Sequence, residues 1–171
     1  ESWSQTSYTI SRAEDLGPDP LKGGIYLPPD SSDLTSERAR SDHDRRHRFV
    51  AAAEGPIPWG GLRISGVLNL ASGAPFNVTT GQDDNLDGIK SDRLSGMGRN
   101  TGENTDLDAV NALRTEEGLE PASKLDEPSF AQLDLRLWKP FGWGARKGGG
   151  QIFLQVFNVL DRDNYAVIEG R

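Results

Sequence analysis

The chain has 171 residues, of which 35% are hydrophobic, with 20 glycines, 10 prolines and a formal net charge of −7. That length is enough for one domain with a sizeable core, and no run approaches the ~18 apolar residues of a transmembrane helix. The absence of cysteine excludes disulfides and thiolate chemistry, and the acidic balance argues against a nucleic-acid partner, which needs a basic surface.

Side-chain patterns predict three strands in the first half of the chain. The first covers Trp3 to Arg12, which is rich in threonine and aromatic residues, and a loop over residues 13–42 follows it. The second covers Arg46 to Gly55 and the third Leu62 to Thr80. Between these two strands, residues 56–61 hold prolines that end a strand and glycines that favour a tight turn.

The third strand shows the clearest two-residue period. One side carries Leu62, Ile64, Gly66, Leu68 and Leu70, and the other carries Arg63, Ser65, Val67, Asn69 and Ala71.

A long acidic loop is predicted over residues 81–128. It holds 12 acidic and 5 basic side chains, so it carries the whole net charge of the chain. A charge confined to one segment points to a local cation site more than to general solubility. Within this loop we expect a short helix that begins with Thr105 as N-cap, runs to Glu117 and is stopped by Gly118. Its apolar stripe would consist of Leu107, Val110 and Leu113.

Two further strands are predicted in the second half. Residues 130–139 alternate leucine with polar side chains, and residues 151–159 alternate in the same way. A turn rich in glycine and basic residues, 140–150, joins them. Residues 160–165 predict a bulge or bend, and residues 166–169 a short continuation.

The polar residues inside the strands favour a membrane barrel over a soluble sandwich. Side chains such as Arg63, Asp134 and Arg136 would each cost several kcal/mol if buried without partners, but little if they face a hydrated lumen. Short turns on one side and long loops on the other are typical of such barrels. Aromatic residues gather at the short-turn ends, as an interfacial girdle would: Trp59, Trp138, Phe141 and Trp143. A soluble sheet with one solvated polar face is the alternative.

Three segments resemble the C-terminal barrel of TonB-dependent outer-membrane receptors, and most closely the Oar-like branch with its carboxypeptidase-regulatory-like N-terminal domain. They are SDHDRRHRFV (residues 41–50), SGAPFNVTTG (72–81) and VFNVLDRDNY (156–165). The resemblance covers nearly the whole chain in order. It implies an all-β fold: an antiparallel meander of about five long strands, part of a 22-stranded transmembrane β-barrel, with long extracellular loops and one short loop helix.

The resemblance also implies the location and partners of the chain. It places the chain in the outer membrane of a Gram-negative-type bacterium, with loops 13–42 and 81–128 extracellular and turns 56–61 and 140–150 periplasmic. The partners are then outer-membrane lipid, an unidentified external ligand, a plug domain and, through the plug, TonB. The plug, the TonB box and most of the barrel would lie outside this chain, which alone should transport nothing.

One motif has definite chemistry. Residues 83–92 fit Asp-x-Asn-x-Asp-Gly, in which alternate oxygens wrap a calcium ion and glycine permits a sharp turn. The candidate ligands are Asp83, Asn85, Asp87, the carbonyl of Ile89, and Asp92. The twelfth position is Leu94, so the bidentate glutamate of an EF-hand is absent and a weak, extracellular-type site is expected. The alternative is an acidic, turn-rich loop that binds nothing specific.

His43 and His47 could suggest a metal site or a hydrolase dyad beside Asp42 and Asp44. In a strand, residues four apart lie ~13 Å from each other, so we favour a salt-bridged strand entrance. No arrangement of a nucleophile and a base is visible, and we expect no enzyme.

Two function classes follow. The first is a segment of a receptor or transporter barrel that takes up or binds an unidentified ligand through a gated barrel. The second is a secreted, calcium-assisted all-β module that binds a glycan or a protein.

Overall fold

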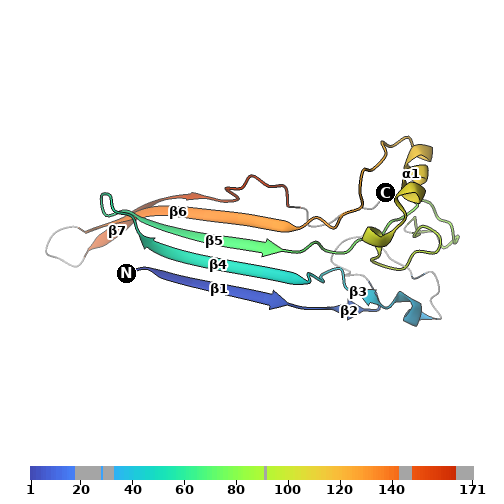
Figure 1. Ribbon diagram of the computed structural model, residues 1–171, viewed down its shortest axis with the longest axis horizontal. Helices are drawn as coiled ribbons and strands as arrows, with labels where there is room; N and C mark the ends of the chain where they lie inside the picture. Colours follow the sequence, from blue (N-terminus) through green and yellow to red (C-terminus); the bar gives the residue numbers. More distant parts are fainter. Residues whose placement is uncertain (18–27, 29–32, 91, 143–147, 165–171) are drawn as a thin grey trace. The chain divides into compact units, whose positions relative to one another are not determined.

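The computed structural model describes residues 1–17, 28, 33–90, 92–142 and 148–164 (Figure 1). The chain divides into two compact units. The sheet unit consists of residues 1–10, 47–71 and 129–164, and the described part of the loop unit comes from segments 11–46 and 72–128.

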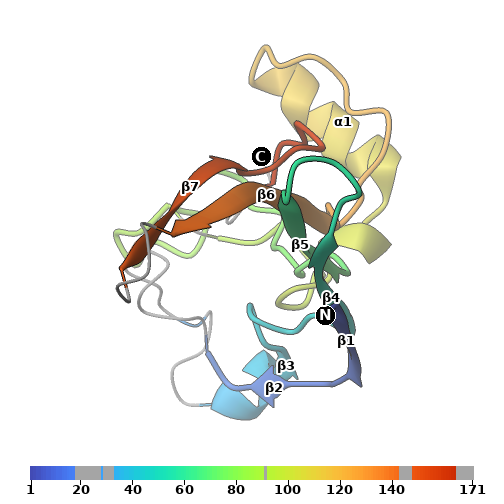
Figure 2. The same cartoon turned by 90° about the vertical axis from the view of Figure 1, so that its left-hand side faces the viewer.

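The sheet unit is an antiparallel meander of five strands (Figure 1). The strands are β1 (Trp3–Ile10), β4 (His47–Pro56), β5 (Arg63–Ala71), β6 (Phe130–Gly142) and β7 (Gly149–Val156). They lie side by side in chain order, β1-β4-β5-β6-β7. In Figure 2, where the strands are seen almost end-on, they follow a curved line from β1 to β7. A strand is therefore present at each of the five predicted places, although the ends differ and the third strand is much shorter than predicted.

The strand register confirms the predicted alternation, because directly paired residues project from the same face of a sheet. Leu68 pairs with Ala51 and Leu133, whereas Asn69 pairs with Val50 and Gln132. The apolar face includes Phe49, Ile64, Leu68, Leu133, Leu135, Leu137, Ile152 and Leu154. The polar face includes Glu54, Arg63, Ser65, Asn69, Gln132, Asp134, Arg136 and Gln155.

Pairing at the strand ends fixes where each connection leaves the sheet. Ile10 pairs with His47, and Ala71 pairs with both Arg48 and Phe130. Segments 11–46 and 72–128 therefore begin and finish at the same end of the sheet. The β4–β5 turn and the β6–β7 connection lie at the opposite end.

The β4–β5 turn forms as its sequence predicts. The amide of Ile57 donates to the Leu62 carbonyl at 3.0 Å, and the amide of Leu62 donates to the Trp59 carbonyl at 3.2 Å. Gly60 and Gly61 have φ of 61° and 68°, the left-handed region that glycine enters without steric cost.

The end of β7 bends where a bend is predicted, although the strand stops earlier, at Val156. The Asn158 amide then donates to Asp134 Oδ1 at 2.9 Å. Further on, the side-chain amide of Asn164 bonds both backbone groups of Ala131, each at 3.0 Å. The chain thus returns to the edge of β6. The predicted continuation at 166–169 lies outside the described residues.

Besides the predicted helix, the loop unit contains short regular elements where the sequence predicts only loop. Over residues 13–42 the short strands β2 (Glu14–Asp15) and β3 (Ala39–Arg40) pair, and the 3-10 helix η2 (Leu34–Glu37) lies between them in sequence. The second segment contains the 3-10 helix η3 (Gly102–Asn104) and the helix α1 (Leu107–Glu116). Among the described residues, no helix is long and apolar enough to cross a membrane.

The predicted third strand is wrong in its second half. β5 ends at Ala71, and residues 75–80 belong to the loop unit instead. Phe76 and Val78 are buried with Val110 of α1, and Leu94 and Leu125 pack against them. The alternation of residues 75–80 therefore serves the core of the loop unit, since burying Phe76 and Val78 removes large apolar surface from water.

The predicted helix is confirmed, but its N-cap is Asp106 and not Thr105. The Asp106 side chain accepts from the Asp108 amide at 3.0 Å. Thr105 ends η3 instead, and its hydroxyl donates to the Thr101 carbonyl. Both residue types are good N-caps, so local preference alone could not separate them. Gly118, with φ of 71°, follows the helix as expected.

The packing of the loop-unit core predicts that Gly102 cannot accept a larger side chain without strain. A Cβ added there would lie 2.6 Å from Phe76 Cδ2, whereas one added at Gly98 would meet only Thr101 Cγ2 at 3.5 Å. Gly102→Ala should therefore destabilise the loop unit by about 1–3 kcal/mol, the usual cost of overpacking. Gly98→Ala is the matched control. Hydrogen exchange of residues 76–78 and 107–116 measures both, and equal protection in the two variants would contradict the packing described here.

Candidate functional site

The polar face of the sheet carries charged side chains, and Arg63 and Glu54 form an ion pair within it. Arg63 donates to Glu54 Oε1 from Nε at 3.1 Å and from Nη2 at 2.8 Å. Its guanidinium also lies 5.3 Å from the centroid of the Trp138 ring. Such charge-assisted bonds and cation–π contacts fix the side chain in one position.

A second arginine on this face also lies against an aromatic ring. The guanidinium of Arg136 lies 4.3 Å from the centroid of the Phe153 ring. Beside it, Asp134 accepts from Gln132 Nε2 at 2.9 Å and from the Asn158 amide at 2.9 Å. The predicted gathering of Arg63, Asp134 and Arg136 on one face is confirmed by the register.

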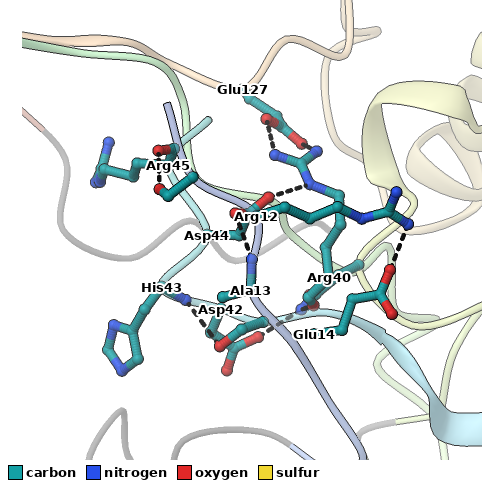
Figure 3. A network of polar contacts seen from close by, with 12 residues as sticks. Arg12, Ala13, Glu14, Arg40, Asp42, His43, Asp44, Arg45 and Glu127 are labelled. Carbon is teal, nitrogen blue, oxygen red and sulfur yellow. Dashed lines mark hydrogen bonds and ion pairs between the residues drawn. The ribbon is translucent and has the colours of Figure 1, made fainter. Parts of the chain in front are cut away.

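The loop unit contains a polar network centred on Arg40 and Asp44 (Figure 3). Asp44 is buried, and its two oxygens accept from the Ala13 amide and from Arg40 Nε, both at 2.9 Å. The other end of the Arg40 guanidinium donates to both oxygens of Glu127, at 2.6 and 3.3 Å, and to Glu103 at 3.3 Å. One guanidinium thus links three carboxylates from distant parts of the chain.

In this network, burial and neighbouring charges shift the pKa values of the side chains in opposite directions. Burial, the largest effect, raises the pKa of Glu127, although the Arg40 guanidinium opposes this change. Burial acts to lower the pKa of Arg40, but its hydrogen bonds to Asp44 and Glu127 prevail and raise that pKa. At the exposed rim of the network, the hydrogen bond from Arg12 lowers the pKa of Glu14.

Two arginines of segment 72–128 also bind carboxylates of segment 11–46. Arg93 makes a bidentate pair with Glu37, at 2.8 and 2.5 Å. Arg99 is fully buried; it bonds the Asp15 side chain and carbonyl, and its Nε donates to the Glu37 carbonyl at 3.1 Å. Asp42 lies 3.7 Å from Arg99 Nη1 and accepts from Asn100 Nδ2 at 2.6 Å.

The two histidines play separate structural roles. His47 lies on β4, where its ring stacks on Tyr8 and its Nδ1 lies 2.8 Å from the Tyr8 hydroxyl oxygen. His43 is an exposed residue of the loop unit, and its backbone amide donates to Ser41 Oγ. Asp42 and Asp44 do form ion pairs, but with Arg99 and Arg40 inside the loop unit, whereas β4 begins only at His47.

All five predicted calcium ligands lie in one turn. Asp83 accepts from the amides of Asp87 and Gly88, at 2.9 and 3.0 Å, and Asp87 accepts from the Ile89 amide at 2.8 Å. Asn85 accepts from the Asp87 amide at 3.0 Å, and Asp92 accepts from the amides of Asp84 and Asn85. Gly88 has φ of 89°, the conformation that the motif requires of glycine.

Over the described ranges, no three side chains of His, Cys, Asp or Glu are grouped so that they could hold a metal ion. The carboxylates bond the amides of their own loop instead. Calcium binding would therefore need these oxygens to turn inward around the ion.

Sequence reasoning missed Arg40, Arg93, Arg99 and Asn100. One signal for them was present in the sequence: the basic residues Arg93 and Arg99 lie within the acidic segment. Which acidic residue each base meets depends on the tertiary fold, and could not be read from spacing.

Comparison with known proteins gives one finding. The model of a family described as outer membrane beta barrel domain matches residues 3–169. The chain belongs to this family, and the match supports a location in the outer membrane of a Gram-negative-type bacterium. No curated protein and no solved structure matches the chain.

Proposed function

We propose that the chain is a barrel segment of a TonB-dependent receptor or transporter, which binds or takes up an external ligand. The observation that carries the proposal is a curved antiparallel sheet from a family of outer-membrane barrels, with one apolar and one polar face. Five strands are fewer than the eight of the smallest such barrels. The outer edges of β1 and β7 are unpaired within the described chain, so in the complete barrel they would pair with further strands.

The proposal assigns the apolar face to lipid and the polar face to the lumen. Leu154, which is 66% exposed, and Ile152, which is 67% exposed, then meet hydrocarbon. A charge on a lipid face costs roughly 2–4 kcal/mol at the midplane, which supports placing Arg63 and Arg136 toward the lumen. Lys139 lies on the apolar face near the end of β6, where a long side chain can reach the membrane surface.

The loop unit is assigned to the cell exterior and the short turns to the periplasm. Outer-membrane barrels have short periplasmic turns and longer outer loops. Segments 11–46 and 72–128 both leave the end of the sheet opposite the β4–β5 turn. Loops 13–42 and 81–128 would then be extracellular, and turns 56–61 and 140–150 periplasmic.

The proposed partners follow from the receptor assignment. They are outer-membrane lipid around the apolar face, a plug domain inside the lumen, TonB acting through that plug, and an external ligand of unidentified chemistry. A secreted glycan- or protein-binding module is the weaker candidate, since the matched family consists of membrane barrels and exposed apolar strands suit lipid.

Calcium binding by residues 83–92 is a second proposal. What supports it is the turn itself: Asp83 and Asp87 bond the amides two to five positions ahead, and Gly88 supplies the left-handed residue. Because the carboxylates must reorient and no glutamate follows at the twelfth position, the expected affinity is that of weak extracellular sites, about 10⁻⁴–10⁻³ M.

The proposed orientation predicts a labelling pattern in whole cells. The chain contains no cysteine, so single cysteines can be introduced without background. Glu116→Cys on the exposed side of α1 should react with a membrane-impermeant maleimide in intact cells. Trp59→Cys, at a position 75% exposed in the β4–β5 turn, should react only after the outer membrane is permeabilised. The reverse pattern would contradict the orientation.

The receptor assignment predicts binding to TonB. The full-length protein, purified in detergent, should bind the periplasmic domain of TonB in a pull-down, and removal of its TonB box should abolish binding. Heat-modifiable migration of the same preparation checks that the barrel is folded. A folded barrel that does not bind TonB would overturn the receptor assignment and leave the family membership intact.

The calcium proposal predicts a calorimetric signal. Titration of the purified protein with Ca²⁺ should give heat that an Asp83→Ala/Asp87→Ala variant loses. Glu116→Ala/Glu120→Ala is the control, because it also removes two negative charges from the same segment. Indistinguishable heats from the unsubstituted protein and the Asp83→Ala/Asp87→Ala variant would eliminate the site.

A further inference from the structure

The described part of segment 11–46 is held together by backbone pairing and hydrogen bonds of its own. Its two arms, residues 11–17 and 33–46, are here called the strap. They are joined by the pairing of β2 with β3 and by the bond from the Ser41 amide to the Ala13 carbonyl at 2.9 Å. The Ala13 amide donates in turn to Asp44 Oδ1 at 2.9 Å. These bonds lie within the strap, so they do not depend on the rest of the loop unit.

The strap contributes no large apolar side chain to the core. Its buried residues in the described ranges are all polar: Glu37, Ser41, Asp42 and Asp44. Its two leucines, Leu16 and Leu34, are 51% and 46% exposed. The apolar core cluster of Phe76, Val78, Val110, Leu94 and Leu125 comes entirely from residues 72–128, here called the loop body.

Arginine–carboxylate pairs hold the strap on the loop body. Glu37 of the strap meets Arg93 of the body with side chains only 2% and 8% exposed. Arg40 of the strap meets Glu127 of the body, and Arg99 of the body meets Asp15 of the strap. The pairs therefore run in both directions across the contact.

Such contacts have a distinct energetic character. The gain of a buried ion pair is largely offset by desolvation, whereas removal of one partner leaves an unpaired buried charge and is strongly destabilising. Apolar burial, in contrast, favours the loop body whether or not the strap is attached. The strap should therefore be the less stable of the two parts.

We propose that the strap is a detachable clasp, which releases from the loop body as a unit while the body stays folded. Release exchanges buried ion pairs for hydrated charges and removes no member of the apolar core cluster. It would uncover a surface of the loop body that carries Arg93, Arg99 and Asn100. This inference does not depend on the receptor assignment, because it concerns contacts within the loop unit alone.

Hydrogen exchange of the full protein in detergent tests the proposal. Glu37→Gln removes the carboxylate that Arg93 binds bidentately, so exchange of residues 33–46 should accelerate by roughly 10²–10⁴-fold, the equivalent of breaking a buried ion pair. Exchange of residues 107–116 should not change. Arg38→Gln is the control, since it breaks only the exposed pair with Glu14 inside the strap.

The unsubstituted protein gives a second readout. At low denaturant concentrations, the strap should exchange through an opening with a weak denaturant dependence and a lower free energy than that of α1. If the strap and α1 exchange with the same free energy and denaturant dependence, or if Glu37→Gln accelerates both equally or neither, the clasp is ruled out.

Discussion

The register between β5 and β6 is the constraint on which the rest of the sheet depends. Side chains alternate with a period of two, so pairing Leu68 with Leu133 fixes the face of every other residue in both strands. A slip by one residue would move Arg63 or Arg136 onto the apolar face. β4 and β7 pair with these two strands and inherit the same division. One pairing therefore decides both surfaces of the sheet.

The strands could be predicted because their signal is local. Two-residue alternation marks a strand and its faces without knowledge of its neighbours, and Gly60 and Gly61 mark the turn between β4 and β5. The end of β5 could not be predicted, since Phe76 and Val78 alternate as well as any strand residue. Only their packing against Val110 takes them out of the sheet. The choice of Asp106 over Thr105 as helix cap was decided in the same way, by the neighbouring η3.

The two polar regions of the loop unit also differ in whether local sequence or tertiary packing determines them. The conformation at Asp83 and Gly88 is local, because side-chain bonds to amides a few positions ahead are written into the spacing. Glu37 and Arg93 are 56 positions apart, and no periodicity links them. Sequence reasoning located the acidic segment and its turn, but it could not assign a carboxylate to each arginine. Those assignments require the folded loop body.

Asn164 occupies backbone hydrogen-bonding groups at the edge of β6. Its Oδ1 accepts from the Ala131 amide and its Nδ2 donates to the Ala131 carbonyl, as the backbone of a neighbouring strand would. An open strand edge is a template on which another chain can add and aggregate. At Ala131 that template is already filled, so an incoming strand would have to displace Asn164 before it could pair there. A single side chain thus closes one position of the sheet to polymerisation.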